Sequence, residues 1–300
     1  MELDSVYRSY RPLLLSIAYR MLGSVADAED LVQDTFLTAQ QMQNDKSVGG
    51  SRVNNLKAYL CKTVTNRCLD YLKSARRKRE VYVGPWLPEP LVQSVDVPSG
   101  QGDPLQTVVL EDTISYAFLV LLDRLTPVER AVFILREAFE YDYGDIAEFL
   151  GKTSLGCRKI YSRLKRKIQD EPPAELPDTA QSEQLVMRFL HATATGDMEG
   201  LFALMAEDIV LYTDGGGKVS AAINPITTSK RVIAFVLGLA AKGETQGEVI
   251  LAKINGQLGF VLRSAIEPYP TVVSLDIRDN RIHRIYLIRN PNKLRHLNLA

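Results

Sequence analysis

The segment from Tyr143 to Ile168, YGDIAEFLGKTSLGCRKIYSRLKRKI, decides how the middle of this 300-residue chain folds. Ile146, Ala147 and Leu150 predict a short helix, and Gly151-Lys152-Thr153 predicts a turn after it. A second helix is expected from Ser154, and its apolar residues can all face inward: Cys157, Ile160, Tyr161, Leu164 and Ile168. Its polar residues then face outward: Arg158, Lys159, Ser162, Arg163 and Arg166. The segment therefore predicts a helix-turn-helix.

The charge of this segment favours DNA as its partner. The whole chain has 36 basic and 36 acidic residues and a net charge of +0, but from Lys152 to Ile168 there are seven Lys or Arg and no acid. A second helix of a helix-turn-helix enters the major groove, where outward cations contact bases and phosphates. The alternative is a pair of packed helices whose basic face is only solvated.

A second basic patch ends a helix expected from about Asn55 to Arg77. Its candidate nucleic-acid residues fall on related faces of that helix: Asn66, Arg67, Asp70, Lys73, Arg76 and Arg77. Cations can hold phosphates while an Asn and nearby aromatic groups receive an unstacked base. The alternative is a basic helix end that is favoured only by the helix dipole.

The helix before it is acidic. It is expected to begin near Ser24, where Ser24 and Asp27 form an S-x-x-D start. Its polar side carries a group of acidic and amide residues: Asp27, Asp30, Gln33 and Asp34. Without further context, helix-dipole chemistry explains acids near a helix start.

The chain divides into five segments. Residues 1–80 and 107–170 are expected to be all-α, and Thr126-Pro127-Val128-Glu129 is a capping box inside the second of them. Residues 81–106 and 171–180 are proline-containing linkers, and the large apolar Trp86 and Leu87 indicate that part of the first linker packs on a domain surface. In 181–300, two helices near 181–195 and 198–206 precede alternating runs at 209–213, 249–254, 259–265, 272–277 and 282–288, with a helix over 230–241 among them. This last segment is expected to be an α+β domain with a curled antiparallel sheet.

Composition excludes several classes of protein. The longest apolar run, residues 232–241, is too short to cross a bilayer, and no secretory signal pattern opens the sequence. The three cysteines form no C-x-x-C pair, and no phosphate-binding GxxxxGK[ST] motif occurs. We therefore expect a cytoplasmic protein with no metal, no cofactor, no membrane partner and no nucleotide hydrolysis.

Two long stretches resemble bacterial sigma factors of the extracytoplasmic-function (ECF) group. YRPLLLSIAYRMLGSVADAEDLVQDTF, over Tyr10–Phe36, resembles sigma region 2, and LCKTVTNRCLDYLKSAR, beginning at Leu60, resembles its promoter-melting and −10-recognising helix. Residues 115–168, from near LTPVERAVFILRE to GCRKIYSRLKRKI, resemble region 4, which recognises the −35 element. The order, spacing and linker fit this family together.

The resemblance extends to a subgroup, the SigJ type, that carries a fused SnoaL-like domain of the NTF2 fold. Its motifs are WLPEP at Trp86–Pro90, DGGGK at Asp214–Lys218 and NPNKL at Asn290–Leu294, where the family usually has Asp in place of Asn292. The implied fold is two all-α sigma domains, region 2 and the region 4 helix-turn-helix, followed by an α+β cone over 181–300.

The resemblance also implies roles for these residues. Asp27, Asp30, Gln33 and Asp34 are expected to dock on the β′ clamp of core RNA polymerase, and region 4 on the β flap. The six residues of the 55–77 helix and the Asp45–Asn55 loop are expected to open and hold the −10 element, and the five outward residues of the 154–168 helix to contact −35 DNA. The three motifs form a candidate interdomain regulatory site: Trp86, Leu87, Pro88, Asp214, Gly215, Gly216, Gly217, Lys218, Asn290 and Pro291.

Two rival functions stay open. One is a ligand-sensing helix-turn-helix regulator that binds duplex operators without polymerase. The other is a SnoaL-like enzyme with a DNA-binding appendage, for which His191, His283 and Asp214 are the few acid–base candidates. We expect a sigma factor that is not an enzyme and is regulated in cis by its last domain, whose pocket could take an unknown small molecule.

Overall fold

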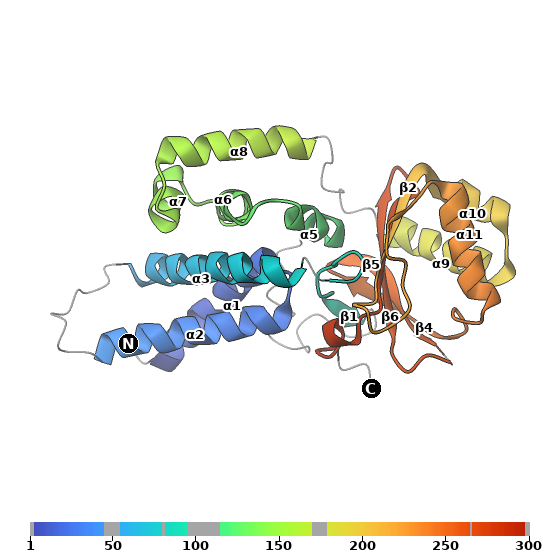
Figure 1. Cartoon of the computed structure of the whole chain (residues 1–300), viewed down its shortest axis with the longest axis horizontal. Coiled ribbons are helices and arrows are strands. Elements are labelled where there is room, and N and C mark those ends of the chain that lie inside the picture. Colours follow the sequence, from blue (N-terminus) through green and yellow to red (C-terminus); the bar gives the residue numbers. More distant parts are fainter. Residues whose placement is uncertain are drawn as a thin grey trace. The chain divides into compact units, whose positions relative to one another are not determined.

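The computed structural model describes residues 3–44, 55–79, 82–94, 115–169, 179–264 and 266–297 (Figure 1). They form two compact units. The helical unit is built from the described parts of residues 1–80 and 121–172, and the sheet unit from those of 81–120 and 173–300. No helix among the described residues is long and apolar enough to cross a membrane.

The helical unit contains α1 (Leu3–Leu22), α2 (Val25–Asn44), α3 (Leu56–Arg79), α6 (Pro127–Glu137), α7 (Tyr143–Leu150) and α8 (Ser154–Gln169). Their termini follow the predicted chemistry. The Ser24 hydroxyl accepts from the Asp27 amide at 3.3 Å, and Thr126 with Glu129 forms the full capping box. Gly151 ends α7 at φ +60°, a left-handed conformation that glycine adopts without strain.

The two helical blocks of the sequence pack together in this one unit. Arg130 of α6 is buried and donates to the Met21 carbonyl of α1 at 2.6 Å, and it also pairs with Asp123 at 2.9 Å. Tyr141 donates to the Cys61 sulfur of α3 at 3.2 Å. A buried guanidinium held by a backbone carbonyl and a carboxylate fixes the position of α6 on α1.

One helix crosses from unit to unit and differs from the predicted stripe. The apolar spacing in this segment predicts one inward stripe, made of Ile114, Phe118, Leu121, Leu122 and Leu125. Leu122 and Leu125 are buried as predicted, but in α5 (Tyr116–Asp123) the residues buried in the sheet unit are Tyr116, Ala117 and Val120. Phe118 and Leu121 are only half-buried, and Ile114 lies outside the described residues. The reason is that α5 buries more than one of its faces, so a pattern that assumes one buried face predicts too few buried residues.

The sheet unit has seven strands in its described part, in the order β1-β4-β5-β6-β7-β2-β3. They are β1 (Val92–Ser94), β2 (Met205–Asp214), β3 (Ile226–Thr227), β4 (Gly247–Ile254), β5 (Gln257–Ser264), β6 (Thr271–Arg278) and β7 (Arg281–Ile288). Asn255-Gly256 and Asp279-Asn280 have positive φ, as the predicted hairpin turns require.

Two features of the sheet correct the sequence prediction. β2 and β7 pair in parallel, so the sheet is not antiparallel throughout; no hairpin joins these strands, and four other strands come between them in the chain. The 81–106 linker is not irregular throughout, because Val92–Ser94 forms β1 on the edge of β4. The short strand is stabilised by this edge pairing and not by its own sequence pattern.

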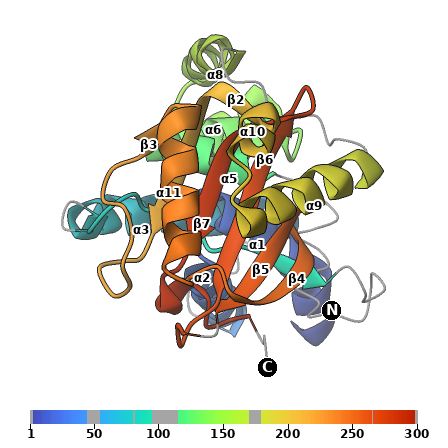
Figure 2. The ribbon, with the colours of Figure 1, turned by 90° about the vertical axis from the view of Figure 1, so that its right-hand side faces the viewer.

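The sheet unit has a separate apolar cluster on each face of the sheet. Helices α9 (Thr179–Thr195), α10 (Met198–Leu204) and α11 (Ser229–Ala241) lie across one face, as Figure 2 shows. The second cluster joins Leu87 of the linker and Tyr116 of α5 to the sheet residues Val272 and Ile288. The linker and the start of α5 are therefore part of the core of this unit, as expected for a linker that packs on a domain surface.

The cysteines give a test of this packing. Cys61, Cys68 and Cys157 are free and buried, and burial raises the pKa of each thiol, so the reactive thiolate is scarce. We expect native protein at pH 8 to react with Ellman's reagent roughly 100-fold more slowly than protein in urea, because each thiol must first be exposed by local opening. Fast labelling of one or more native thiols would contradict the packing around α3 or α8.

Candidate nucleic-acid interface and linker clasp

The outward face of α8 is a continuous basic surface. The five predicted residues are all exposed: Arg158, Lys159, Ser162, Arg163 and Arg166. Cys157, Leu164 and Ile168 on the opposite side are buried, while Ile160 and Tyr161 are half-buried against the helical unit. α8 itself contains no Asp or Glu, so no acidic side chain of this helix neutralises the basic row. Glu129 and the acidic residues of α7 belong to other helices. The face can contact a phosphate backbone and base edges together.

Two details of this surface were not predicted. Leu155 is 62% exposed and lies three residues before Arg158, so an apolar side chain stands on the face that would enter the groove, where thymine methyl groups offer apolar contact. The Arg158 guanidinium lies 5.2 Å from the centre of the Tyr143 ring. Tyr143 is in the first turn of α7, and this cation–π contact orients the Arg158 side chain. The sequence shows Leu155, but its exposure follows only from the position of α8 on α6 and α7.

The predicted residues of α3 divide between two environments. Asp70 and Lys73 are exposed and pair with each other at 2.8 Å, and Asn66 is half-buried one turn before them. Arg67 turns instead toward α2, where it donates to Thr38 at 2.7 Å and approaches Asp34 at 3.5 Å. The structure thus brings a predicted DNA residue, Arg67, together with a predicted polymerase residue, Asp34. Arg76 and Arg77 belong to α3, but their side chains lie outside the described part of the structure, as does most of the 45–55 loop.

The polar row of α2 remains largely available to a partner. Asp30, Gln33 and Asp34 are exposed, and Asp27 is half-buried beside the helix start. Leu37, which was not among the predicted site residues, is 49% exposed and continues the same row one turn beyond Gln33 and Asp34. An exposed leucine beside carboxylates is suited to a protein surface that is basic with an apolar centre.

The three motifs of the candidate regulatory site meet in the sheet unit around one buried carboxylate. Asp214, at the end of β2, is fully buried and accepts from four donors of three chain segments. The Tyr82 hydroxyl donates at 2.5 Å, the Leu87 amide at 2.9 Å, the Gly216 amide at 3.0 Å and the Lys293 ammonium at 2.7 Å. We call this group, Tyr82, Trp86, Leu87, Asp214, Asn290 and Lys293, the linker clasp.

Lys293 supplies the charge that this carboxylate needs. Its side chain is 7% exposed, and it also donates to the Leu87 carbonyl. Its ammonium lies 4.0 Å from the centre of the Trp86 ring and 5.1 Å from that of Tyr82, so two aromatic faces cover the cation. Lys293 and Tyr82 were absent from the predicted site, although Lys293 stands in the quoted NPNKL motif.

The glycines of DGGGK are needed for close approach to the clasp. Gly216 has φ +59°, and a side-chain carbon there would come within 2.2 Å of the Asn290 amide nitrogen. Gly217 has φ +70° and lies against Val83 of the linker. Asn290 donates to the Tyr82 hydroxyl at 2.8 Å, so the loop, the linker and the end of the chain lock together. The DGGGK loop is therefore a contact loop of the linker clasp.

Asn292 shows what its departure from the usual aspartate does here. The Lys218 ammonium donates to the Asn292 side-chain oxygen at 2.8 Å, an exposed hydrogen bond that the amide can still accept. The linker is fastened beyond the clasp as well, because Leu91 and Asn255 exchange hydrogen bonds and Tyr116 donates to the Pro88 carbonyl at 2.6 Å.

Two family models match the chain: Sigma-70 region 2 over residues 6–78, and Sigma-70 region 4 over residues 115–168. The ECF RNA polymerase sigma factor SigJ of Mycobacterium tuberculosis is 32% identical over 303 residues, which cover 96% of this chain and 92% of SigJ. The probable ECF sigma factor SigI of the same species is 31% identical over 97% of the chain and 94% of SigI. The crystal structure of M. tuberculosis SigJ matches with a TM-score of 0.77 at 29% identity, over 99% of this chain and 100% of that one.

The chain belongs to the ECF family of RNA polymerase sigma factors. Its function is that of a sigma factor: it binds RNA polymerase and recognises promoters. The whole-chain match to SigJ also confirms the predicted fold class at the level of helical sigma domains followed by an α+β domain. The operator-binding regulator that acts without polymerase is not favoured. In this sigma factor α3 belongs to the region 2 match and α8 to the region 4 match.

Proposed function

We propose that this sigma factor divides promoter recognition between α3 and α8, and that its C-terminal domain regulates it in cis by holding the linker between them. For −35 DNA we assign the exposed face of α8, namely Arg158, Lys159, Ser162, Arg163 and Arg166, with Leu155 added from its exposure. For the −10 element we assign Asn66, Asp70 and Lys73 together with Arg67, Arg76 and Arg77. As a sigma factor it is expected to act where RNA polymerase works, in the cytoplasm.

The polymerase contacts are assigned by charge. The row Asp30, Gln33, Asp34 and Leu37 of α2, with Asp27 at its start, is proposed to dock on the β′ clamp, and region 4 on the β flap. Exposed carboxylates give fast, oriented association with a basic partner, while Leu37 adds apolar area at the end of the row. Arg67 is proposed to hold α2 and α3 in one orientation, so that polymerase binding and −10 recognition are coordinated.

The proposal of regulation in cis rests on the linker clasp. It buries Leu87 and Leu91 of the linker, and the Tyr116 hydroxyl at the start of α5 bonds to the linker carbonyl of Pro88. The path of the chain from α3 to α6 is therefore partly built on the C-terminal domain. A linker segment fixed in this way reaches less far than a free one, so the clasp sets where region 4 can be placed. We infer that the domain is a scaffold that promoter use requires.

No catalytic role is proposed for the C-terminal domain. The sigma family is not an enzyme family, and the carboxylate of Asp214 is fully engaged by the clasp. Asp214 and His283 do not line the cavity of the domain, and His191 lies at its exposed edge. Among the described residues no group of three metal-ligating side chains gathers. An acid–base pair aimed into the cavity, which the rival enzyme needs, is not formed by the three candidates.

Run-off transcription with purified bacterial core polymerase tests the proposal, on promoters selected from a random library. We expect transcripts with the intact chain, and much less with Asp30→Lys/Asp34→Lys, in which acids of the docking row are reversed. Gly216→Ala should also lower the yield, because it opens the clasp, whereas Gly196→Ala should not; Gly196 has a similar φ of +73° but nothing within 4 Å of the added carbon. If none of the forms produces a transcript, sigma function is overturned. If Gly216→Ala yields more transcript than the intact chain, the C-terminal domain inhibits promoter use and is not the scaffold that we infer.

Truncation is a poor substitute for these point variants. A chain ending near Glu171 loses the sheet on which Leu87, Leu91 and Tyr116 are buried. Their exposure would create an apolar patch and promote association of the truncated protein. Loss of activity in such a chain would not distinguish a missing regulator from a damaged linker.

A further inference from the structure

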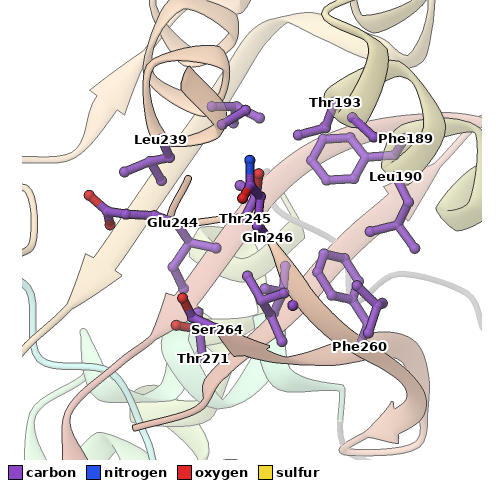
Figure 3. Close-up of a pocket in the computed structure, with 18 of the residues that line it drawn as sticks. Phe189, Leu190, Thr193, Leu239, Glu244, Thr245, Gln246, Phe260, Ser264 and Thr271 are labelled. Carbon is purple, nitrogen blue, oxygen red and sulfur yellow. The ribbon is translucent and has the colours of Figure 1, made fainter. Parts of the chain in front are cut away.

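The sheet unit has a partly open cavity on the face of the sheet that α9 and α11 cover. Its volume is about 680 Å³, within the range of sites that hold drug-sized ligands. The walls come from α9, α11 and strands β4 to β7, with the 244–247 turn between them (Figure 3). No role in polymerase or DNA binding has been assigned to any of these residues.

The lining has an apolar body and one polar end. Phe189, Leu190 and Phe260 lie on one side in Figure 3, with the Phe189 and Phe260 ring centroids 6.4 Å apart. Glu244 and Ser264 lie away from this aromatic side. A cavity with apolar walls and a few polar groups at one end selects an amphipathic ligand in one orientation.

The charges at the polar end define what the ligand can carry. Arg289 donates to Glu244 at 3.1 Å and to the Ser220 carbonyl at 2.9 Å, and it approaches Glu267 at 3.5 Å. One guanidinium is therefore set against two carboxylates, so the group has a formal charge of −1. An anionic ligand would meet an already neutralised cation and an excess carboxylate, whereas a hydroxyl could donate to either acid.

We propose that this cavity is a binding site for an uncharged, predominantly apolar small molecule with a hydrogen-bond donor at one end. The apolar rings of such a ligand lie against Phe189 and Phe260, and its donor meets Glu244 or Glu267. Binding removes apolar surface of both partners from water and leaves no ligand charge to desolvate.

Arg289 links this site to the clasp. Its side chain lies at the polar end of the cavity, while its backbone amide donates to the Asp214 carbonyl at 2.8 Å, and Asn290 is the next residue. A ligand that competes for Glu244 changes the partners of Arg289, and we infer that the clasp responds. This second part rests on the proposed function of the clasp, whereas binding itself does not.

Fluorescence titration of the full chain tests binding without polymerase or DNA. The probes are 1-pyrenemethanol, which is uncharged and carries a hydroxyl donor, and 1-pyrenecarboxylate, which has the same ring system and a negative charge. We expect saturable binding of one pyrenemethanol per chain, and binding of the carboxylate that is weaker by roughly tenfold or more. Equal affinity for the two probes, or no saturable binding of pyrenemethanol, would overturn the proposal.

Two variants locate the site. Ala240→Phe fills the cavity from α11 and should weaken pyrenemethanol binding by roughly tenfold or more, whereas Ala203→Phe, an exposed position of α10 outside the lining, should leave it unchanged. If Ala240→Phe does not fold, Glu244→Gln serves instead: removing one carboxylate should bring the affinities for the two probes closer together. If Glu244→Gln leaves the ratio of the affinities for pyrenemethanol and pyrenecarboxylate unchanged, the probes bind outside this cavity.

The link to the clasp has its own readout. Because coupling between two sites is reciprocal, Gly216→Ala should change the affinity for pyrenemethanol by a factor of about two or more relative to Gly196→Ala. Equal affinities in these two variants would overturn the proposed link between the cavity and the clasp. The titration of the intact chain would still decide whether the cavity binds the ligand. Failure of the run-off experiment leaves the titration unaffected, so the two proposals fail separately.

Discussion

Lys293→Met should destabilise the sheet unit more than any other single change at the clasp. The substitution keeps most of the unbranched apolar stem of lysine but removes the ammonium group, so the buried Asp214 carboxylate loses its cation. Leaving one partner of a buried ion pair unpaired costs roughly 3–5 kcal/mol, which corresponds to a fall in melting temperature of about 6–20 °C for a unit of this size. Thermal unfolding followed by circular dichroism measures the effect.

Trp86 reports the same event locally. It is the only tryptophan of the chain, and its ring covers the Lys293 ammonium at 4.0 Å. In Lys293→Met we expect the tryptophan emission of the folded protein to change. Greater exposure of the Trp86 ring to water would shift the emission to longer wavelength. Lys218→Met is the matched control: its exposed bond to Asn292 should contribute less than about 1 kcal/mol, and the emission should stay as in the intact chain.

A double-mutant cycle separates the pair from general damage. Asp214→Asn removes the charge that needs Lys293, so the Asp214→Asn/Lys293→Met protein should be more stable than the sum of the two single effects predicts. Strict additivity would mean that the two side chains do not act as a pair, and the clasp would have to be redefined around Tyr82 and Leu87.

Arg158→Ala/Arg163→Ala should nearly abolish promoter recognition while leaving the fold intact. Both side chains are exposed on the outward face of α8, so their removal creates no cavity. Each good contact to DNA contributes roughly 1–3 kcal/mol, so losing two should lower transcription from a −35-dependent promoter by about 30-fold or more. Run-off yield at fixed salt measures this loss, with circular dichroism as the check on folding.

The control for this pair lies on the same helix. Lys165→Ala removes an exposed cation whose ammonium lies 6.0 Å from the Tyr161 ring and which is not among the residues assigned to DNA. It should reduce yield only slightly and equally on all promoters. Leu155→Ala should act differently, with a loss that depends on the bases of the −35 element. If Lys165→Ala costs as much as the arginine pair, α8 contributes charge alone and its assigned face is wrong.

The sequence was sufficient wherever a pattern is local. The turn at Gly151, the capping box at Thr126 and the hairpins at Asn255-Gly256 and Asp279-Asn280 each depend on residues within a few positions of one another. The same holds for the α8 face, because outward and inward residues of a helix are fixed by its period. The resemblance to sigma factors rests on such local patterns in the right order.

Only the tertiary structure could decide what distant residues do together. Asp214 meets Tyr82 and Leu87 across 132 and 127 positions, and Lys293 meets Leu87 across 206, so no spacing rule connects them. The turn of Arg67 toward Asp34, the strand β1 in the linker and the parallel pair β2–β7 have the same origin. Each side chain or strand forms the contacts that its neighbours in space allow, and those neighbours are brought together by burial of apolar surface over the whole unit. The sequence therefore determined the helices, the hairpins and the family, whereas the packed sheet determined the clasp and the cavity.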